Sequence, residues 1–276
     1  MAILPCVAFS ALLLFTLASC GGQSVESYIA DLSHPDREVR LKASYELVLI
    51  GGPAVEPLIA RVVTGSDSLH YISAQVLGRI GDKRAIPFLQ KLAKEPNAFV
   101  RREAILSLGK MGNPAMGPFL QVALVGDKAA EVRSAAAQSL GNLRDTLAVL
   151  PLVQALADSA ALVRQQAVAA LHRLWTPTAE AAVASTLKDR DETVRYIAVQ
   201  SLGKHRVLQA LDLLRAALRD SSVWVRVEAA RALARLGDPG AVDDLVRLLK
   251  QHGGPDHQAA REALQELTGM DYVVVQ

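Results

Sequence analysis

A repeat with a period of about 31 residues runs through most of the 276-residue chain. The stretch DSSVWVRVEAARALARLGD, at 220–238, contains one copy, and its Arg226 has a basic counterpart in every other copy. These anchor positions are Arg40, His70, Arg101, Arg133, Arg164, Arg195, Arg226 and His257, with steps of 30, 31, 32, 31, 31, 31 and 31 residues. A period between 20 and 50 residues is typical of a solenoid, in which each unit packs on its neighbours.

Small and apolar residues recur at fixed distances from each anchor. A leucine stands seven residues after all eight anchors, and alanine stands three residues after seven of them. Around Arg226 the apolar residues fall on one helical face, and a shorter amphipathic run precedes them. Each copy therefore predicts a pair of helices, which can bury its apolar face only by stacking on another pair. We predict an all-α, right-handed solenoid of about eight helical hairpins over 24–268, followed by a C-terminal tail at 269–276.

The pattern "D…VRxxAxxxLGxxGD" resembles HEAT repeats, in the short form also found in phycobilin lyase subunits. The resemblance covers about residues 24–268. It implies a solenoid whose second helices line the concave inner surface, and it says little about function. The lyase resemblance implies one alternative, an enzyme subunit that helps to attach a tetrapyrrole to a protein cysteine.

The first twenty residues contain no charged side chain. An apolar run over 7–18 has the length of the hydrophobic region of a signal peptide. The tetrapeptide Leu17-Ala18-Ser19-Cys20 resembles a bacterial lipobox, which implies cleavage before Cys20 and lipidation of that residue. We therefore expect a signal peptide at 1–19, a lipidated Cys20 and tether at 20–23, and a lipoprotein of the cell envelope that faces the periplasm or the exterior.

Composition and motifs exclude several functions. The chain has 30 basic and 28 acidic residues, which argues against nucleic-acid binding. It has no Gly-x-Ser-x-Gly, phosphate loop, dinucleotide fingerprint or Cys-x-x-Cys, and no His-Glu pair like those of deoxyhypusine hydroxylase, another HEAT-repeat protein. The spacing of His252, Asp256 and His257 is too loose for zinc. We expect no catalysis, no cofactor and no metal.

The anchor arginines are predicted to have a structural role. At the start of each second helix, a guanidinium can bond the turn carbonyls or an aspartate between the two helices, because arginines away from water are usually paired. This interpretation covers Arg40, Arg101, Arg133, Arg164, Arg195 and Arg226. Phe99 and Trp224, which stand two residues before anchors, are expected to pack between repeats.

A second basic column is the candidate binding surface. Nine residues after the anchors stand Arg79, Lys110, Arg173, Lys204 and Arg235, and Arg231 lies on the same helical face. Two interpretations remain open: cations that complement the helix dipoles, and a strip that binds a partner on the concave surface. The second predicts a membrane-tethered scaffold or adaptor for an acidic protein or peptide. An anionic envelope glycan is a further alternative to the lyase subunit.

Overall fold

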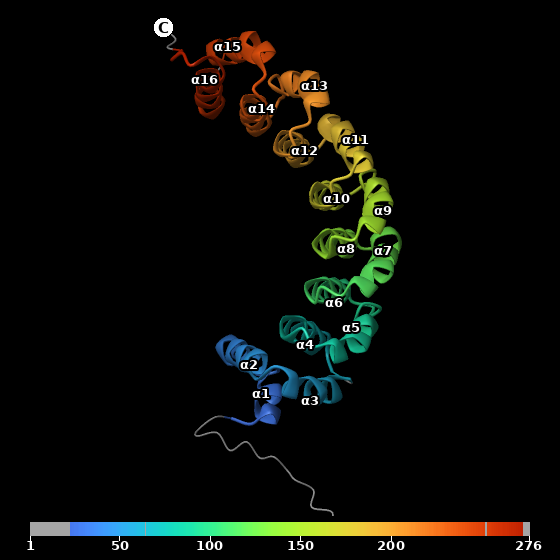
Figure 1. The fold of residues 1–276 in the computed structure, drawn as a ribbon. Helices are drawn as coiled ribbons and strands as arrows, with labels where there is room; N and C mark the ends of the chain where they lie inside the picture. Colours follow the sequence, from blue (N-terminus) through green and yellow to red (C-terminus); the bar gives the residue numbers. More distant parts are fainter. Residues whose placement is uncertain (1–22, 64, 252, 273–276) are drawn as a thin grey trace, which may run out of the picture.

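The computed structural model describes residues 23–63, 65–251 and 253–272, and these form an all-α solenoid (Figure 1), which confirms the predicted fold class. The predicted signal peptide at 1–19, Cys20 and the end of the predicted C-terminal tail lie outside the described residues. The outer helices are α1 (Val25–Asp31), α3 (Gly52–Val62), α5 (Ile86–Leu92), α7 (Gly117–Gly126), α9 (Val149–Ala155), α11 (Pro177–Ser185), α13 (Leu211–Ala217) and α15 (Val242–Gln251). The inner helices are α2 (Arg37–Ile50), α4 (Asp67–Ile80), α6 (Ala98–Lys110), α8 (Ala130–Leu143), α10 (Ala161–Arg173), α12 (Glu192–Lys204), α14 (Val223–Leu236) and α16 (Pro255–Thr268).

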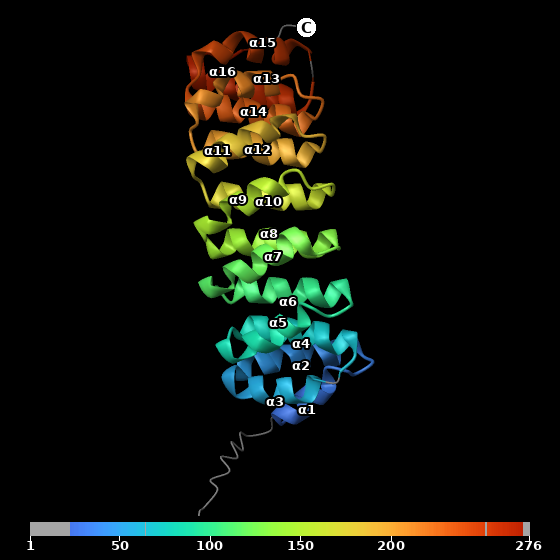
Figure 2. The same cartoon turned by 90° about the vertical axis from the view of Figure 1, so that its right-hand side faces the viewer.

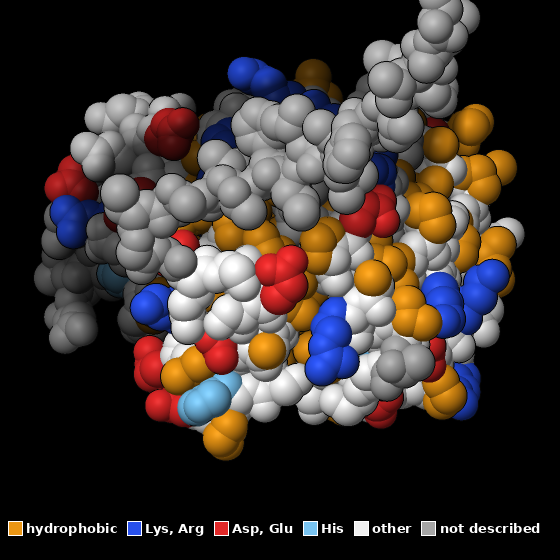
Figure 3. Space-filling model, turned by 90° about the horizontal axis from the view of Figure 1, so that it is seen from below, with side chains coloured by type: hydrophobic (Ala, Val, Ile, Leu, Met, Phe, Trp, Pro, Cys, Tyr) orange, Lys and Arg blue, Asp and Glu red, His pale blue; other side chains and the backbone are white. Residues whose placement is uncertain are grey.

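The two sets of helices form two layers of a curved stack. The even-numbered helices line the concave side and the odd-numbered helices lie on the convex side (Figure 1). Seen from the convex side, the hairpins follow one another along a single axis (Figure 2). The N-terminal end of this stack carries hydrophobic and charged side chains interspersed on one surface (Figure 3), as expected for a terminal repeat that covers the core.

The core consists of small and branched side chains. Every leucine of the repeat column, from Leu47 to Leu264, is fully buried. The alanines three residues after the anchors are buried with them. Among the Phe, Trp and Tyr side chains of the described residues, only those of Tyr28 and Phe88 are buried. Small side chains let helices approach closely, which explains a core with so few rings.

Glycines set the distance between neighbouring inner helices. Eight residues after an anchor, Gly78, Gly109, Gly141 and Gly203 lie against the next inner helix. A Cβ on any of them would clash with the facing residue, which is Ser107, Ser139, Ala170 or Ala232 respectively. The backbones of these helix pairs therefore pack in near contact.

Three junctions carry a residue other than glycine at this position: Ala234 in α14 is small, whereas the residues in α2 and α10 are larger. Val48 occupies it in α2, and α2 packs less extensively on α4 than α4 does on α6. His172 occupies it in α10, where its ring contacts the rings of Trp175 and His205. Trp175 and His205 are stacked with their centroids 3.8 Å apart, so aromatic rings fill that junction. The repeats are therefore not evenly spaced along the solenoid.

No helix among the described residues is both long enough and apolar enough to cross a membrane.

The glycine contacts predict a sharp difference between two substitutions. Gly109→Ala forces a methyl group into Ser139, and we expect the free energy of unfolding to fall by about 1–3 kcal/mol. Gly126→Ala, also at a helical position, meets no neighbouring atom and should be neutral or slightly stabilising. Urea denaturation followed by circular dichroism measures both. Equal effects of the two substitutions would show that the close approach is not needed.

Candidate functional site

Five anchor arginines form a ladder along the solenoid. Each arginine of an inner helix binds the carboxylate of an aspartate in the following repeat, with nitrogen to oxygen distances between 2.6 and 2.8 Å. The pairs, which we call the arginine ladder, are Arg101–Asp127, Arg133–Asp158, Arg164–Asp189, Arg195–Asp220 and Arg226–Asp256. The ladder therefore joins the six repeats from α6 to α16.

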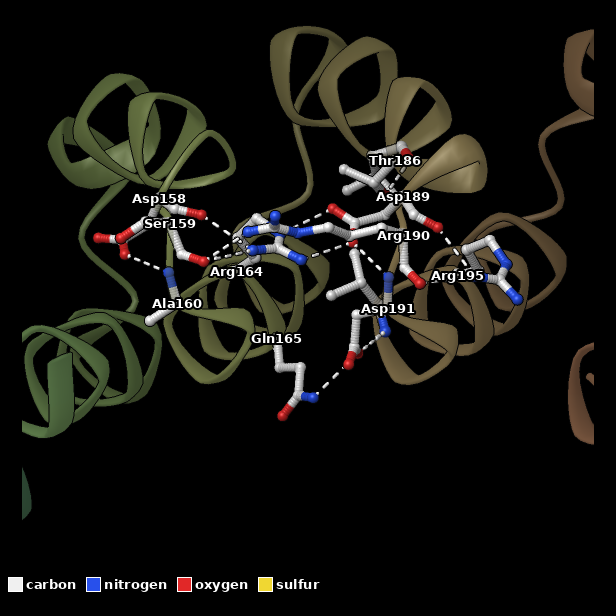
Figure 4. A network of polar contacts seen from close by, with 12 residues as sticks. Asp158, Ser159, Ala160, Arg164, Gln165, Thr186, Asp189, Arg190, Asp191 and Arg195 are labelled. Atoms are coloured by element: carbon white, nitrogen blue, oxygen red, sulfur yellow. Dashed lines mark hydrogen bonds and ion pairs between the residues drawn. The ribbon is translucent and has the colours of Figure 1, made fainter.

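Each ladder arginine also binds the turn of its own repeat. Nη1 of Arg164 donates to the carbonyls of Asp158 and Ser159, at 2.9 and 3.2 Å (Figure 4). Its Nε and Nη2 each donate to one carboxylate oxygen of Asp189, both at 2.8 Å. The Asp189 carbonyl in turn accepts from Nη1 of Arg195, at 2.8 Å. Asp189 therefore accepts from two successive ladder arginines, through its carboxylate and through its carbonyl. We call each arginine–aspartate pair a rung, and successive rungs form one continuous network.

The ladder keeps its aspartates ionised. Burial alone would raise the pKa of Asp189, but hydrogen bonds from Arg164 and from the Asp191 N–H outweigh it, so the pKa lies below its ordinary value of 3.8. The pKa of Asp127 and that of Asp220 are lowered through the same balance. For Asp158, the hydrogen bond from Arg133 is the largest cause of a lowered pKa. The corresponding pKa values of the arginines that bind them are raised by those hydrogen bonds.

The remaining anchors lie outside this pattern. Nη1 of Arg40 donates to the carbonyls of His34 and Pro35, both at 2.7 Å, and the described residues provide it with no acidic partner. His70 contacts the carbonyl of Val62 through Nε2, at 3.0 Å. Nδ1 of His257 contacts the Leu249 carbonyl, at 2.9 Å. The ladder is therefore confined to the central and C-terminal repeats.

The candidate partner-binding residues lie on the inner helices. Five of them stand in the last turns of α4, α6, α10, α12 and α14, one below another along one edge of the concave side, and Arg231 is one turn further back in α14. All six side chains are exposed, namely those of Arg79, Lys110, Arg173, Lys204, Arg231 and Arg235. We call this set the basic strip.

Two cations of the basic strip are paired within their own helix. Lys110 Nζ lies 3.9 Å from a carboxylate oxygen of Glu103, and Arg235 Nη1 lies 2.9 Å from one of Glu228. Both glutamates are nearly buried, at 3% and 2% exposure. Among the described residues, no acidic side chain pairs with the other four, which are Arg79, Arg173, Lys204 and Arg231. These four carry the strip's uncompensated charge.

The prediction that Phe99 and Trp224 pack between repeats is wrong. Phe99 is 65% exposed and Trp224 is 59% exposed. Each stands in the first turn of an inner helix, ahead of the buried valine that enters the core, so its ring projects past the core toward solvent. The basic strip and these aromatic residues therefore occupy opposite ends of the inner helices.

Surface hollows accompany both aromatic residues, and sequence reasoning missed them. Trp224 lines a hollow of about 310 Å³ with Glu192, Thr193, Tyr196 and Ser222. Phe99 lines a larger one of about 970 Å³ between the first three repeats. The exposed aromatic residues at one register were the signal, but burial at that register can be judged only in three dimensions.

No group of three or more His, Cys, Asp or Glu side chains in the described part of the chain is arranged to hold a metal ion. Asp256, one residue of the loose histidine cluster, is instead buried against Arg226. His252 lies outside the described residues.

The family of HEAT repeats matches three overlapping stretches, residues 55–141, 118–187 and 179–265. Together they span most of the solenoid, so the chain belongs to the HEAT-repeat family. A search of curated protein sequences finds no significant match.

Solved structures share the architecture at low sequence identity. The Escherichia coli protein YibA gives a TM-score of 0.67 at 22% identity, over 89% of this chain and 92% of that one. An engineered protein gives 0.51 at 22% identity, over 88% and 78%. The CpcE–CpcF complex of phycocyanin lyase from a Nostoc species gives 0.47 at 21% identity, over 91% and 97%. The likenesses to YibA and to the engineered protein show the fold alone.

The ladder predicts acid lability of a defined sign. Because the folded-state pKa values of Asp127, Asp158, Asp189 and Asp220 are lowered, their stabilisation is present above pH 3.8 and lost as the pH falls through the lowered values. Asp189→Asn should lower the free energy of unfolding by about 3 kcal/mol at pH 6 and reduce its further loss below pH 3.8. Urea titrations at pH 6 and pH 3 measure both effects.

Asp212→Asn is the matched control, because Asp212 is 93% exposed at its side chain and pairs only at the surface. It should change the free energy of unfolding by roughly 0–1 kcal/mol. An acid response of Asp189→Asn identical to that of the wild type would contradict the role of the ladder.

Proposed function

We propose that this protein is a non-catalytic scaffold, held on a bacterial envelope membrane by lipidated Cys20, that binds an acidic protein or peptide along its concave inner surface. The observation that carries the proposal is the recurrence of exposed cations in the last turns of five inner helices, at one end of the concave layer. Because the solenoid holds its inner helices in a fixed arrangement, the distances between these cations are fixed. A long partner can therefore contact several of them at once.

The uncompensated cations distinguish this interpretation from a pure dipole effect. A lysine or arginine in the last turn of a helix complements the helix dipole whichever way its side chain is paired. Arg231 lies one turn before the end of α14, and it is exposed without an acidic partner among the described residues. Summed over several repeats, such charges accelerate the association of an acidic partner and orient it.

The membrane tether rests on the sequence of the first twenty residues. A lipid anchor on Cys20 would place the solenoid at the surface through the short Gly21-Gly22-Gln23 linker. The tether would raise the local concentration of the binding surface for partners on the same membrane. A lyase-like subunit and a binder of anionic envelope glycan are the alternatives, and a bound chromophore or glycan would identify them.

Charge reversal along the basic strip tests the proposal. The variant carries Arg79→Glu, Arg173→Glu, Lys204→Glu and Arg231→Glu in the full-length protein, and leaves the two cations that pair with buried glutamates. After photo-crosslinking in cells and affinity capture, we expect recovery of the partner to fall at least about ten-fold, because the charge that attracts it is inverted. Quantitative mass spectrometry measures the recovery.

The matched control reverses four exposed cations on the outer helices and the turns that follow them. Its substitutions are Arg61→Glu, Lys91→Glu, Lys94→Glu and Lys188→Glu, which change the net charge by the same amount. Recovery should remain at the wild-type level in this control. Equal loss in both variants, or loss in neither, would refute binding by the basic strip.

Cysteine substitution tests the tether. With an alkyne-labelled fatty acid supplied to the cells, the wild-type protein should incorporate the label, and its mature chain should begin at residue 20. Cys20→Ser should abolish both labelling and cleavage, whereas Cys6→Ser should preserve both, because Cys6 lies in the segment that is removed. Intact-mass spectrometry and in-gel detection of the label measure the outcome. A labelled Cys20→Ser protein would exclude this anchor.

A further inference from the structure

Arg40 has the same position as the ladder arginines but lacks a carboxylate to bind. Its Nη1 donates hydrogen bonds to two carbonyls of the preceding turn, as Nη1 of each ladder arginine does. In the ladder, the Nε and Nη2 of the guanidinium bind an aspartate of the next repeat, as Arg101 does with Asp127 at 2.8 Å. Among the described residues, no acceptor faces Nε or Nη2 of Arg40. Its guanidinium is thus oriented for a carboxylate that the next repeat does not supply.

The unpaired Nε and Nη2 of Arg40 belong to a residue that lines a hollow on the surface. This hollow, of about 970 Å³, lies between the turn before α2 and the N-terminal ends of α4 and α6. We call it the N-terminal pocket. The same junction also carries Val48 in place of a glycine, at the opposite, C-terminal end of α2. One junction therefore lacks a rung at one end and a close glycine contact at the other.

A second arginine in the N-terminal pocket also has an unpaired group. Arg102 lines the pocket, and its Nε is buried with no hydrogen-bond partner among the described residues. A buried donor without an acceptor costs free energy, and no partner in the described part of the chain offsets this cost at Nε of Arg102. The carboxylate of Asp67 also lines the pocket, but it accepts a hydrogen bond from the Asn97 side chain, at 2.8 Å. The two arginines thus outnumber the acidic group.

The walls of the pocket suit an apolar residue beside the charge. Tyr71 and Ile72 of α4 contribute, together with Leu32 of the first repeat and the exposed ring of Phe99. Such a mixture buries a short apolar side chain while the guanidinium groups meet the charge. Free inorganic anions would leave these walls uncovered.

We propose that the N-terminal pocket binds an aspartate or glutamate side chain of an extended peptide, flanked by apolar residues, with its carboxylate on Nε and Nη2 of Arg40 and with the charge of Arg102 in the same pocket. The carboxylate takes the place that an aspartate of the next repeat has in each rung. A bidentate arginine–carboxylate pair is among the stronger polar contacts in proteins. The inference extends the proposed function by naming a specific anchor for the partner, distinct from the basic strip.

Three synthetic peptides test the pocket on solubilised full-length protein. The first, acetyl-Leu-Asp-Leu-Gly-amide, presents a side-chain carboxylate, and the second replaces its aspartate with asparagine. The third keeps the asparagine and ends in a free carboxylate. We expect the first peptide to bind at least about ten-fold more tightly than the other two in isothermal titration calorimetry. Its binding should also shift the Nε–H nuclear magnetic resonance signals of Arg40 and Arg102.

Variants locate the site. Arg40→Gln and Arg102→Gln should each weaken the first peptide at least about five-fold, and Arg40→Lys should weaken it comparably because it retains the charge without the bidentate edge. Thermal melting verifies folding; Arg40→Gln removes no ion pair among the described residues. Lys188→Gln, at an exposed position outside both the basic strip and the N-terminal pocket, is the control that should leave peptide binding unchanged. Equal binding of all three peptides, unchanged binding to Arg40→Gln, or a free-terminus peptide as tight as the first would overturn the proposal.

The peptide experiments test the N-terminal pocket, and the charge-reversal capture tests the basic strip, so each can fail while the other succeeds. A partner lost in the strip variant, together with peptides that fail to bind, would leave the proposed function standing and refute the pocket. Aspartate-dependent peptide binding that requires Arg40, together with a strip variant that behaves like its control, would support the pocket and refute the strip.

Discussion

The arginine ladder is the interaction on which the rest of the solenoid depends. Each ladder arginine joins three parts of the protein: its own inner helix, the carbonyls of the turn before that helix, and an aspartate of the next repeat. A hydrophobic stack resists separation of repeats but resists sliding less, because apolar contact has little directionality. Bidentate hydrogen bonds are directional, so the ladder sets the register between repeats. The positions of the exposed inner residues, including the basic strip, follow from that register.

Much of this could be predicted from the spacing of residues alone. The buried leucine column and the two-helix repeat follow from periodicity, and the arginine column pointed to turn carbonyls and aspartates as acceptors. The partner in each case was not visible, because Asp189 lies 25 residues beyond Arg164 and meets it only when two repeats stack. We expected Phe99 to pack between repeats because only two of the eight residues at this register are Phe or Trp, which do not form a patch. In the first turn of a helix, however, adjacent residues point in directions about 100° apart, so only one of them enters the core.

Glycine explains why repeats of nearly equal length do not stack equally. Where the position eight residues after the anchor is Gly78 or Gly109, the next helix lies against the backbone itself. Val48 and His172 insert side chains at the same position and hold two junctions wider. The space at these two wider junctions is filled differently. Stacked rings of Trp175 and His205 occupy the junction after α10, whereas the junction after α2 remains hollow at one edge. One repeat pattern therefore produces both a solid junction and an open one.

The open junction shows how a structural repeat can become a binding site through loss of an internal contact. In the ladder, each anchor guanidinium binds a carboxylate of the next repeat, so its Nε and Nη2 are not available to a ligand. In the first repeat, the guanidinium of Arg40 keeps the same hydrogen bonds to two carbonyls, because these bonds need only the turn before α2. The site is thus oriented without a ligand, so a ligand would not have to order the guanidinium, and the entropy cost of binding is smaller. The ladder stabilises the repeats from α6 to α16. In the first repeat of the described chain the ladder is absent, so Nε and Nη2 of Arg40 remain available to a ligand.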